Sequence, residues 1–281
     1  MIVDQEKSPI IIYGAPRSGT TYLAQLLNKH PEVFVSIEAR LFIWAHHSMN
    51  VLTQNDQFLF QHRERFIQYL HTVYPRLIRD FYLMLRPQAC YWGDKNPQYA
   101  EPANRGCLEA ILALFPGAHF IHIVRDGRDV VSSIIRKGWR NFEGAHQWWK
   151  DHVDVGSAFG RSIPPDQYFE LRYEDLVRDD GAVACKLFDF LGIEMHPRVL
   201  KFCQAQQEQR TPINLPTRDL SSNEANPDWR MLLAPDQQLH SLELLGRHLI
   251  KYGYETASSL VEAQRELSEL CPAGTSLLRP P

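Results

Sequence analysis

The sequence lacks the features that mark several large classes of protein. Its five cysteines are scattered, odd in number and never spaced Cys-x-x-Cys, so we expect reduced thiols rather than a disulfide framework. No apolar run approaches the ~20 residues that cross a bilayer, and the opening segment MIVDQEKSPI has no long apolar stretch behind a basic flank. Neither a membrane span nor a signal peptide is expected, and the predicted location is the cytoplasm.

An excess of positive charge is also missing. The formal net charge of the 281 residues is −3, with 44% hydrophobic and 22% charged residues. Proteins that grip nucleic acid along their length usually carry a basic excess. We therefore expect no nucleic-acid partner, and the mild acidity argues against a long acidic polysaccharide. A local basic pocket stays compatible with this composition.

Strand and helix patterns alternate along the chain. Short apolar runs, which are typical of strands buried on both faces, occur at 8–13, 30–36, 90–97, 118–126 and 167–176. Helical spacing occurs at 19–29, 54–86, 98–115, 127–138 and 142–160. The alternation predicts an α/β fold with a parallel β-sheet flanked by helices. We expect one domain over 1–281, with a helical insertion at about 40–90 and a loosely ordered C-terminal tail.

A glycine-rich turn follows the first apolar run, in IIIYGAPRSGTT. Backbone N–H groups at such a turn converge where the helix dipole favours an anion. Gly14-x-x-x-x-Gly19-Thr20-Thr21 nearly matches the phosphate loop Gly-x-x-x-x-Gly-Lys-Ser/Thr. Thr20 occupies the lysine position, while Arg17 supplies a cation elsewhere in the loop. The loop therefore predicts an anion site that is poorly suited to hydrolysing nucleoside triphosphates.

A second strand-to-helix junction lies in FIHIVRDGRDVVSS. Arg125 ends the strand, and Ser132 and Ser133 come about two turns into the helix. A guanidinium forks onto phosphate oxygens and a hydroxyl adds a donor, so this is a second candidate anion site. Arg128 and Lys137 are weaker candidates. The alternative interpretation makes Asp126 a helix cap and Ser133 an ordinary helical residue.

Two segments together resemble one family. GAPRSGTTYLAQLL resembles the 5′-phosphosulfate loop of sulfotransferases that use 3′-phosphoadenosine 5′-phosphosulfate (PAPS), and VRDGRDVVSSIIRKG resembles their 3′-phosphate motif. LRYEDL resembles a third segment of the family. The resemblance covers residues 8–192 and is nearest to bacterial-type and tyrosylprotein sulfotransferases. It implies a fold like that of P-loop NTPases, PAPS as co-substrate, 3′-phosphoadenosine 5′-phosphate (PAP) as product, and no metal. The nucleotide ligands that it implies are Arg17, Ser18, Gly19, Thr20, Thr21, Arg125, Ser133 and, near the adenine, Tyr173, for which a core role is the alternative.

Catalytic candidates follow from the same resemblance. The family's acidic base comes after a His-Pro turn, and here His30-Pro31 precedes Glu38. Related small-molecule enzymes use a histidine instead, so His46 and His47 are rivals. Lys95 in WGDKNP resembles the lysine that faces the transferred sulfuryl group. Lys95 and Arg17 would together stabilise the charge that develops during transfer.

Other features depart from the family pattern and keep alternatives open. The serine that tyrosylprotein enzymes have two residues before a late tryptophan is Pro227 here, before Trp229. A phosphotransferase or kinase with a degenerate phosphate loop is one alternative, and a non-catalytic nucleotide-binding protein is another. Either protein would have the same anion-binding loop. The sequence does not identify the acceptor beyond its hydroxyl group, which a small molecule, a sugar, a lipid or a tyrosine would each provide. A homodimer is a further open expectation.

Overall fold

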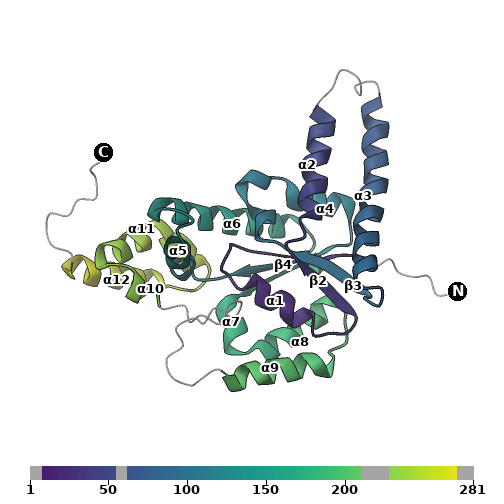
Figure 1. Cartoon of the computed structure of the whole chain (residues 1–281). Helices are drawn as coiled ribbons and strands as arrows, with labels where there is room; N and C mark the ends of the chain where they lie inside the picture. The colour runs from purple at the N-terminus through teal and green to yellow at the C-terminus, as the bar shows by residue number, and fades with distance from the viewer. Residues whose placement is uncertain (1–7, 55–61, 210–227, 271–281) are drawn as a thin grey trace. The chain divides into compact units, whose positions relative to one another are not determined.

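The computed structural model describes residues 8–54, 62–209 and 228–270 (Figure 1). The chain divides into two compact units, Met1–Val124 with Asp151–Pro212, and Arg125–Lys150 with Ile213–Pro281. Each unit is described by itself below. The single domain expected from the sequence stays a prediction, and the tail after residue 270 lies outside the described residues.

A five-stranded parallel sheet forms the centre of the first unit. Its strands are β1 (Ile10–Tyr13), β2 (Val33–Ile37), β3 (Tyr91–Lys95), β4 (His119–Val124) and β5 (Tyr168–Arg172), in the order β2-β3-β1-β4-β5. All four strand pairs are parallel. The middle strand, Ile-Ile-Ile-Tyr, is wholly buried, because helices cover both faces of the sheet. The predicted α/β fold class is confirmed.

Helices cover the sheet on its two sides (Figure 1). One side carries α2 (Leu41–Gln54), α3 (Arg63–Leu85) and α4 (Cys107–Leu114), and the other carries α1 (Thr20–Leu27), α8 (Asp180–Leu191) and α9 (Pro197–Gln209). The short α7 (Tyr173–Arg178) follows β5, and α6 (Phe142–Ser162) has its later residues in this unit. The predicted helical insertion at about 40–90 consists of α2 and α3, which pack as a hairpin.

An aromatic cluster fills the space between the sheet and α2–α4. Trp92 stacks on Phe42 and Tyr82, with ring centroids 6.4 and 5.0 Å apart, and meets Phe115 edge-on at 5.5 Å. Buried aromatic pairs stabilise a fold beyond the area that they remove from water. This cluster therefore holds α2 and α3 against the sheet.

The predicted helix at 98–115 is only partly helical. Two 3₁₀ turns, η2 (Pro97–Ala100) and η3 (Pro102–Asn104), come first, and α4 begins only after Gly106. Each turn begins with a proline, which suits a first helical position but disrupts an interior one. Gly106 has a φ of 85°, which also breaks a continuous helix. The helical spacing was correct only for residues 107–114.

The second unit is helical in its described part. It contains α5 (Gly127–Arg136), the first turns of α6, α10 (Trp229–Leu232), α11 (Pro235–Lys251) and α12 (Ala257–Leu270). The side chains of Trp149 and Leu245 pack against Gly127, where an added Cβ would lie within about 3 Å of both. Residues 210–227, which join the two units along the chain, lie outside the described residues. No described helix combines the length and the apolar character that crossing a membrane requires.

Candidate active site

Strand register gathers the predicted residues at one edge of the sheet. Lys95 at the end of β3 pairs with Ile12 of β1 on one side and with Ile37 of β2 on the other. The glycine-rich loop follows β1, and Glu38 follows β2. The carboxyl ends of parallel strands are where open α/β sheets bind ligands. Three segments that are distant in sequence therefore meet where chemistry is expected.

The loop is packed so closely that two of its positions require glycine. A Cβ on Gly14 would lie 2.2 Å from the carbonyl oxygen of Ile123 in β4. Gly19 has a φ of 89°, and its Cβ would lie 2.4 Å from the ring of Tyr173. Tyr173 is thus a buried support beneath the loop. Its predicted role near the adenine stays a prediction.

The far end of the loop has the properties of an anion site. Gly19 caps α1 without a side-chain hydrogen bond, so the first N–H groups of this helix keep their positive character. Ser18 is fully buried, and its Oγ has no hydrogen-bond partner among the described residues. Thr20 is also buried. A buried hydroxyl without a partner requires an explanation, and an anion that accepts from Ser18 and the helix N–H groups provides one.

Glu38 and Lys95 are in direct contact. Lys95 Nζ lies 2.8 Å from Glu38 Oε1, and the side chains are 3% and 46% exposed. The Glu38 backbone N–H also donates to the Lys95 carbonyl oxygen at 2.8 Å. Within the described residues, Glu38 forms an ion pair with Lys95. The structure brings together the two residues that the sequence nominated as base and sulfuryl-facing cation.

Residues with a strained backbone conformation lie in the glycine-rich loop and in the turn after β2. Among the described non-glycine residues, positive φ occurs at Arg17 (74°), Glu38 (59°) and Arg40 (61°). This left-handed conformation is costly for residues with a Cβ, and such strain tends to occur at functional sites. Two of the three positions are residues predicted from sequence to act in catalysis.

Asp94 precedes Lys95 in β3 and connects to the segment that carries Glu38. It is fully buried and accepts hydrogen bonds from the Ser36 hydroxyl, the Tyr99 hydroxyl and, at 3.1 Å, the Ala39 N–H. Burial raises the pKa of Asp94, while the bonds from Ser36 and Tyr99 oppose that rise. Asn96, not Asp94, caps the following turn by accepting from the Gln98 N–H. Asp94 therefore ties the turn that carries Glu38 to the strand that carries Lys95.

The histidines named as rival bases are engaged elsewhere on α2. His46 is buried with Nε2 3.2 Å from the Asn50 amide, and burial lowers its pKa. His47 Nε2 lies 2.8 Å from Asn104 Oδ1. Neither contact involves Glu38 or Lys95.

The second anion motif lies in the other unit. Arg125 and Ser133 are buried, and the Arg125 guanidinium lies 3.6 Å from Asp129 Oδ2. Asp126 caps α5 by accepting from the Arg128 N–H at 2.9 Å, as the alternative interpretation of the motif expects. That cap leaves Arg125 and Ser133 as the motif's phosphate candidates.

Arg128, a weaker phosphate candidate, contacts other side chains of this unit. Its guanidinium donates to Asp126 and Glu255 and lies 4.6 Å from the centre of the Trp229 ring. The two carboxylates balance the positive charge of Arg128. Arg128 therefore links α5 to the segments around α10 and α12. The sequence offered no signal for this network, because Glu255 is 127 residues from Arg128.

Comparisons with known proteins identify the family. A sequence profile of the sulfotransferase family matches residues 9–197, so the chain belongs to that family. The fold agrees: the sulfotransferase domain of the curacin biosynthetic pathway superposes with a TM-score of 0.57 at 21% identity, over 85% of this chain and 98% of that one. A mouse sulfotransferase solved with PAP superposes at 0.50 and 14% identity, over 95% and 90% of the two chains.

Curated relatives are similar over part of their length. A protein-tyrosine sulfotransferase of Drosophila melanogaster is 26% identical over 213 residues, which are 70% of this chain and 40% of that protein. An omega-hydroxy-beta-dihydromenaquinone-9 sulfotransferase of Mycobacterium bovis is 34% identical over 106 residues, 33% and 27% of the two chains. The chain thus spans less than half the length of these relatives.

Proposed function

We propose that this protein transfers the sulfuryl group of PAPS to a hydroxyl acceptor, with Glu38 as the general base. The observation that carries the proposal is the contact between Glu38 and Lys95 at the carboxyl edge of the sheet, one strand from the loop. A base and a cation in contact beside an anion cradle are the groups that in-line transfer to a hydroxyl requires.

The loop residues Arg17, Ser18, Gly19, Thr20 and Thr21 would hold the 5′-phosphosulfate. The unpartnered Ser18 hydroxyl and the uncapped start of α1 support this assignment. Arg125 and Ser133 would hold the 3′-phosphate, which needs a forked cation and a hydroxyl donor. That a mouse family member binds PAP agrees with this choice of nucleotide. In this scheme arginine, lysine and backbone N–H groups neutralise the anion, so the reaction needs no metal.

In the reaction, the acceptor oxygen forms a bond to sulfur as the bond from sulfur to the 5′-phosphate oxygen breaks. The acceptor's proton passes to the Glu38 carboxylate. Negative charge grows on the departing phosphate, where Lys95 and Arg17 would stabilise it. His46 and His47 are less suited, because each already bonds to another side chain on the helical side of the site.

The proposal includes several classes of hydroxyl acceptor. Named relatives act on protein tyrosine and on a hydroxylated menaquinone, and a sugar or another small molecule would present the same hydroxyl group. The cytoplasmic location and the homodimer stay predictions. Incubating the protein with radiolabelled PAPS and representatives of each acceptor class would identify the acceptor.

Calorimetry tests the nucleotide assignment. We expect adenosine 3′,5′-bisphosphate to bind in EDTA, while ATP with magnesium does not. The reverse result would favour a phosphotransferase with a degenerate loop. Binding of PAP without turnover of PAPS on any acceptor would favour a non-catalytic nucleotide-binding protein.

The base assignment is tested by Glu38→Gln. PAP binding should persist while transfer falls by roughly 10²–10⁴-fold. Glu32→Gln is the matched control, because Glu32 is exposed just before the opposite end of β2. Transfer by E38Q at the level of E32Q would remove Glu38 from this role and return His46 and His47 to consideration.

A further inference from the structure

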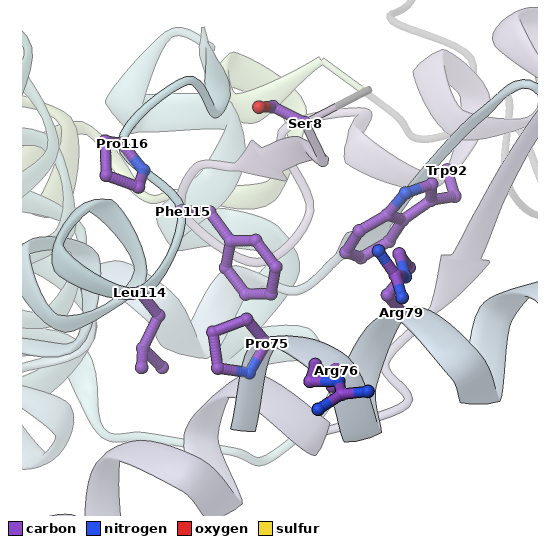
Figure 2. Close-up of a pocket in the computed structure, with 8 residues that line it drawn as sticks. All are labelled: Ser8, Pro75, Arg76, Arg79, Trp92, Leu114, Phe115 and Pro116. Atoms are coloured by element: carbon purple, nitrogen blue, oxygen red, sulfur yellow. The ribbon is translucent and has the colours of Figure 1, made fainter. Parts of the chain in front are cut away.

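A pocket lies at the edge of the sheet opposite the candidate active site. Its volume is about 160 Å³, and Figure 2 shows its eight lining residues, Ser8, Pro75, Arg76, Arg79, Trp92, Leu114, Phe115 and Pro116. Ser8 precedes β1, Trp92 is near the start of β3, and Pro116 precedes β4. The pocket is therefore at the amino ends of strands whose carboxyl ends lead to the loop and Lys95. No residue assigned above to donor or acceptor chemistry lines it.

The interior of this pocket is apolar and aromatic. Trp92 and Phe115 are buried and meet edge-to-face at 5.5 Å. In Figure 2 Phe115 lies at the centre, with Pro75 of α3 and Leu114 around it. An apolar cavity of about 150 Å³ is large enough for one benzene ring. The pocket volume of about 160 Å³ therefore suits a single aromatic ring or a branched aliphatic group of that size.

Two cations belong to the same lining. Arg76 and Arg79 are three residues apart on α3, a spacing that places side chains on neighbouring parts of one helix surface. None of the eight lining residues is acidic. Asp80, next to the pocket, is largely exposed and lies 3.6 Å from the Arg79 guanidinium. A small apolar chamber with two guanidinium groups and a hydroxyl in its lining selects for an anion with an apolar body.

We propose that this pocket binds a small aromatic or branched aliphatic carboxylate. Its apolar body would lie against Trp92 and Phe115, and its carboxylate would face Arg76 and Arg79, because guanidinium groups match carboxylate geometry. The proposal does not depend on the transferase assignment. It adds a ligand site to the side of the sheet away from the candidate catalytic residues.

A charge series on one ring tests the proposal. Phenylacetate, phenylacetamide and phenethylamine have similar size and carry negative, zero and positive charge. Titration of ¹⁵N-labelled protein should shift the Trp92 indole resonance and the Leu114 and Phe115 amides saturably with phenylacetate. We expect affinity about tenfold weaker for the amide and weaker still for the amine, from the loss of a charge-assisted contact. Saturating PAP should leave these shifts unchanged.

Substitutions of the two arginines test whether they cause the preference for a negatively charged ligand. Arg76→Gln should bring phenylacetate close to phenylacetamide in affinity, and the double variant R76Q/R79Q should abolish the difference. Arg63→Gln is the control, because Arg63 is exposed at the start of the same helix and does not line the pocket. Equal affinity of the three probes for the wild type, no saturable shift at Trp92, or a preference that persists in R76Q/R79Q would each overturn the proposal.

Discussion

Asp94→Asn should separate the positioning of the base from nucleotide binding. Asp94 accepts from two hydroxyls and the Ala39 N–H without any exposure to water. An asparagine has nearly the same shape, but its NH₂ group cannot accept. Asp94 Oδ1 accepts from both Ser36 and Ala39, and Oδ2 accepts from Tyr99. The NH₂ group therefore faces either the Ala39 N–H or the Tyr99 hydroxyl, and at least one donor loses its acceptor. An unsatisfied buried donor costs about 1–3 kcal/mol.

The net loss of stability should be near the lower end of that range. Burial raises the pKa of Asp94, which means that its ionised form is costly to bury, and asparagine avoids that cost. The larger effect should be on transfer. The Ala39 contact holds the turn that carries Glu38, and a displacement of about 1 Å in reacting groups can lower a rate about 10²-fold. We expect D94N to lose about 1–2 kcal/mol and about 100-fold in transfer.

The assays are urea unfolding, PAP calorimetry and transfer at saturating PAPS. Ser36→Ala is the graded control, because it removes one hydroxyl donor and leaves the Ala39 contact to Asp94 in place. It should reduce transfer less than D94N does. Transfer by D94N within threefold of the wild type, despite a measurable loss of stability, would refute the reasoning. So would a parallel loss of PAP binding, since the hydrogen-bond donors to Asp94, namely Ser36, Ala39 and Tyr99, all lie outside the loop.

Two further predictions concern packing and pH. Gly19→Ala should abolish PAP binding and destabilise the protein by more than Gly138→Ala. Both have positive φ, which costs about 1–2 kcal/mol, but only Gly19 has a neighbour, Tyr173, within 4 Å of an added Cβ. Equal urea midpoints for the two variants would contradict the packing argument. Burial lowers the pKa of His146 to about 4, below its unfolded value of about 6.5. The unfolded chain therefore binds the extra proton between these values, so stability is complete above about pH 6.5 and falls by about 3 kcal/mol as the pH drops to about 4. His146→Gln should flatten urea-unfolding free energies over that window, and an unchanged slope would count against the buried neutral histidine that bonds to Ser241.

Local patterns in the sequence predicted the strands well and one helix poorly. A strand lies within or overlaps each of the five segments expected to be strands. The wholly buried β1 is apolar throughout, as a strand covered on both faces must be, whereas β5 is only partly buried and residues 173–176 of its expected segment belong to α7. Between residues 97 and 107 the helical spacing was misleading, since the prolines and Gly106 broke the segment into turns. The family motifs were readable for a similar reason: phosphate-binding loops depend on a short, contiguous set of glycines and donors.

Contacts between distant residues could not be read in the same way. Glu38 and Lys95 are 57 residues apart, and Ser36 and Asp94 are 58 apart. Whether such residues meet depends on which strands pair and in which register, and a shift of one residue turns a side chain to the other face of the sheet. The sequence alone therefore determined the class of fold, the family motifs and the candidate residues. Pairing of β3 with β2 brought Glu38 to Lys95 and placed Ser36 against the buried Asp94, because side-chain contacts across a sheet depend on strand order and register.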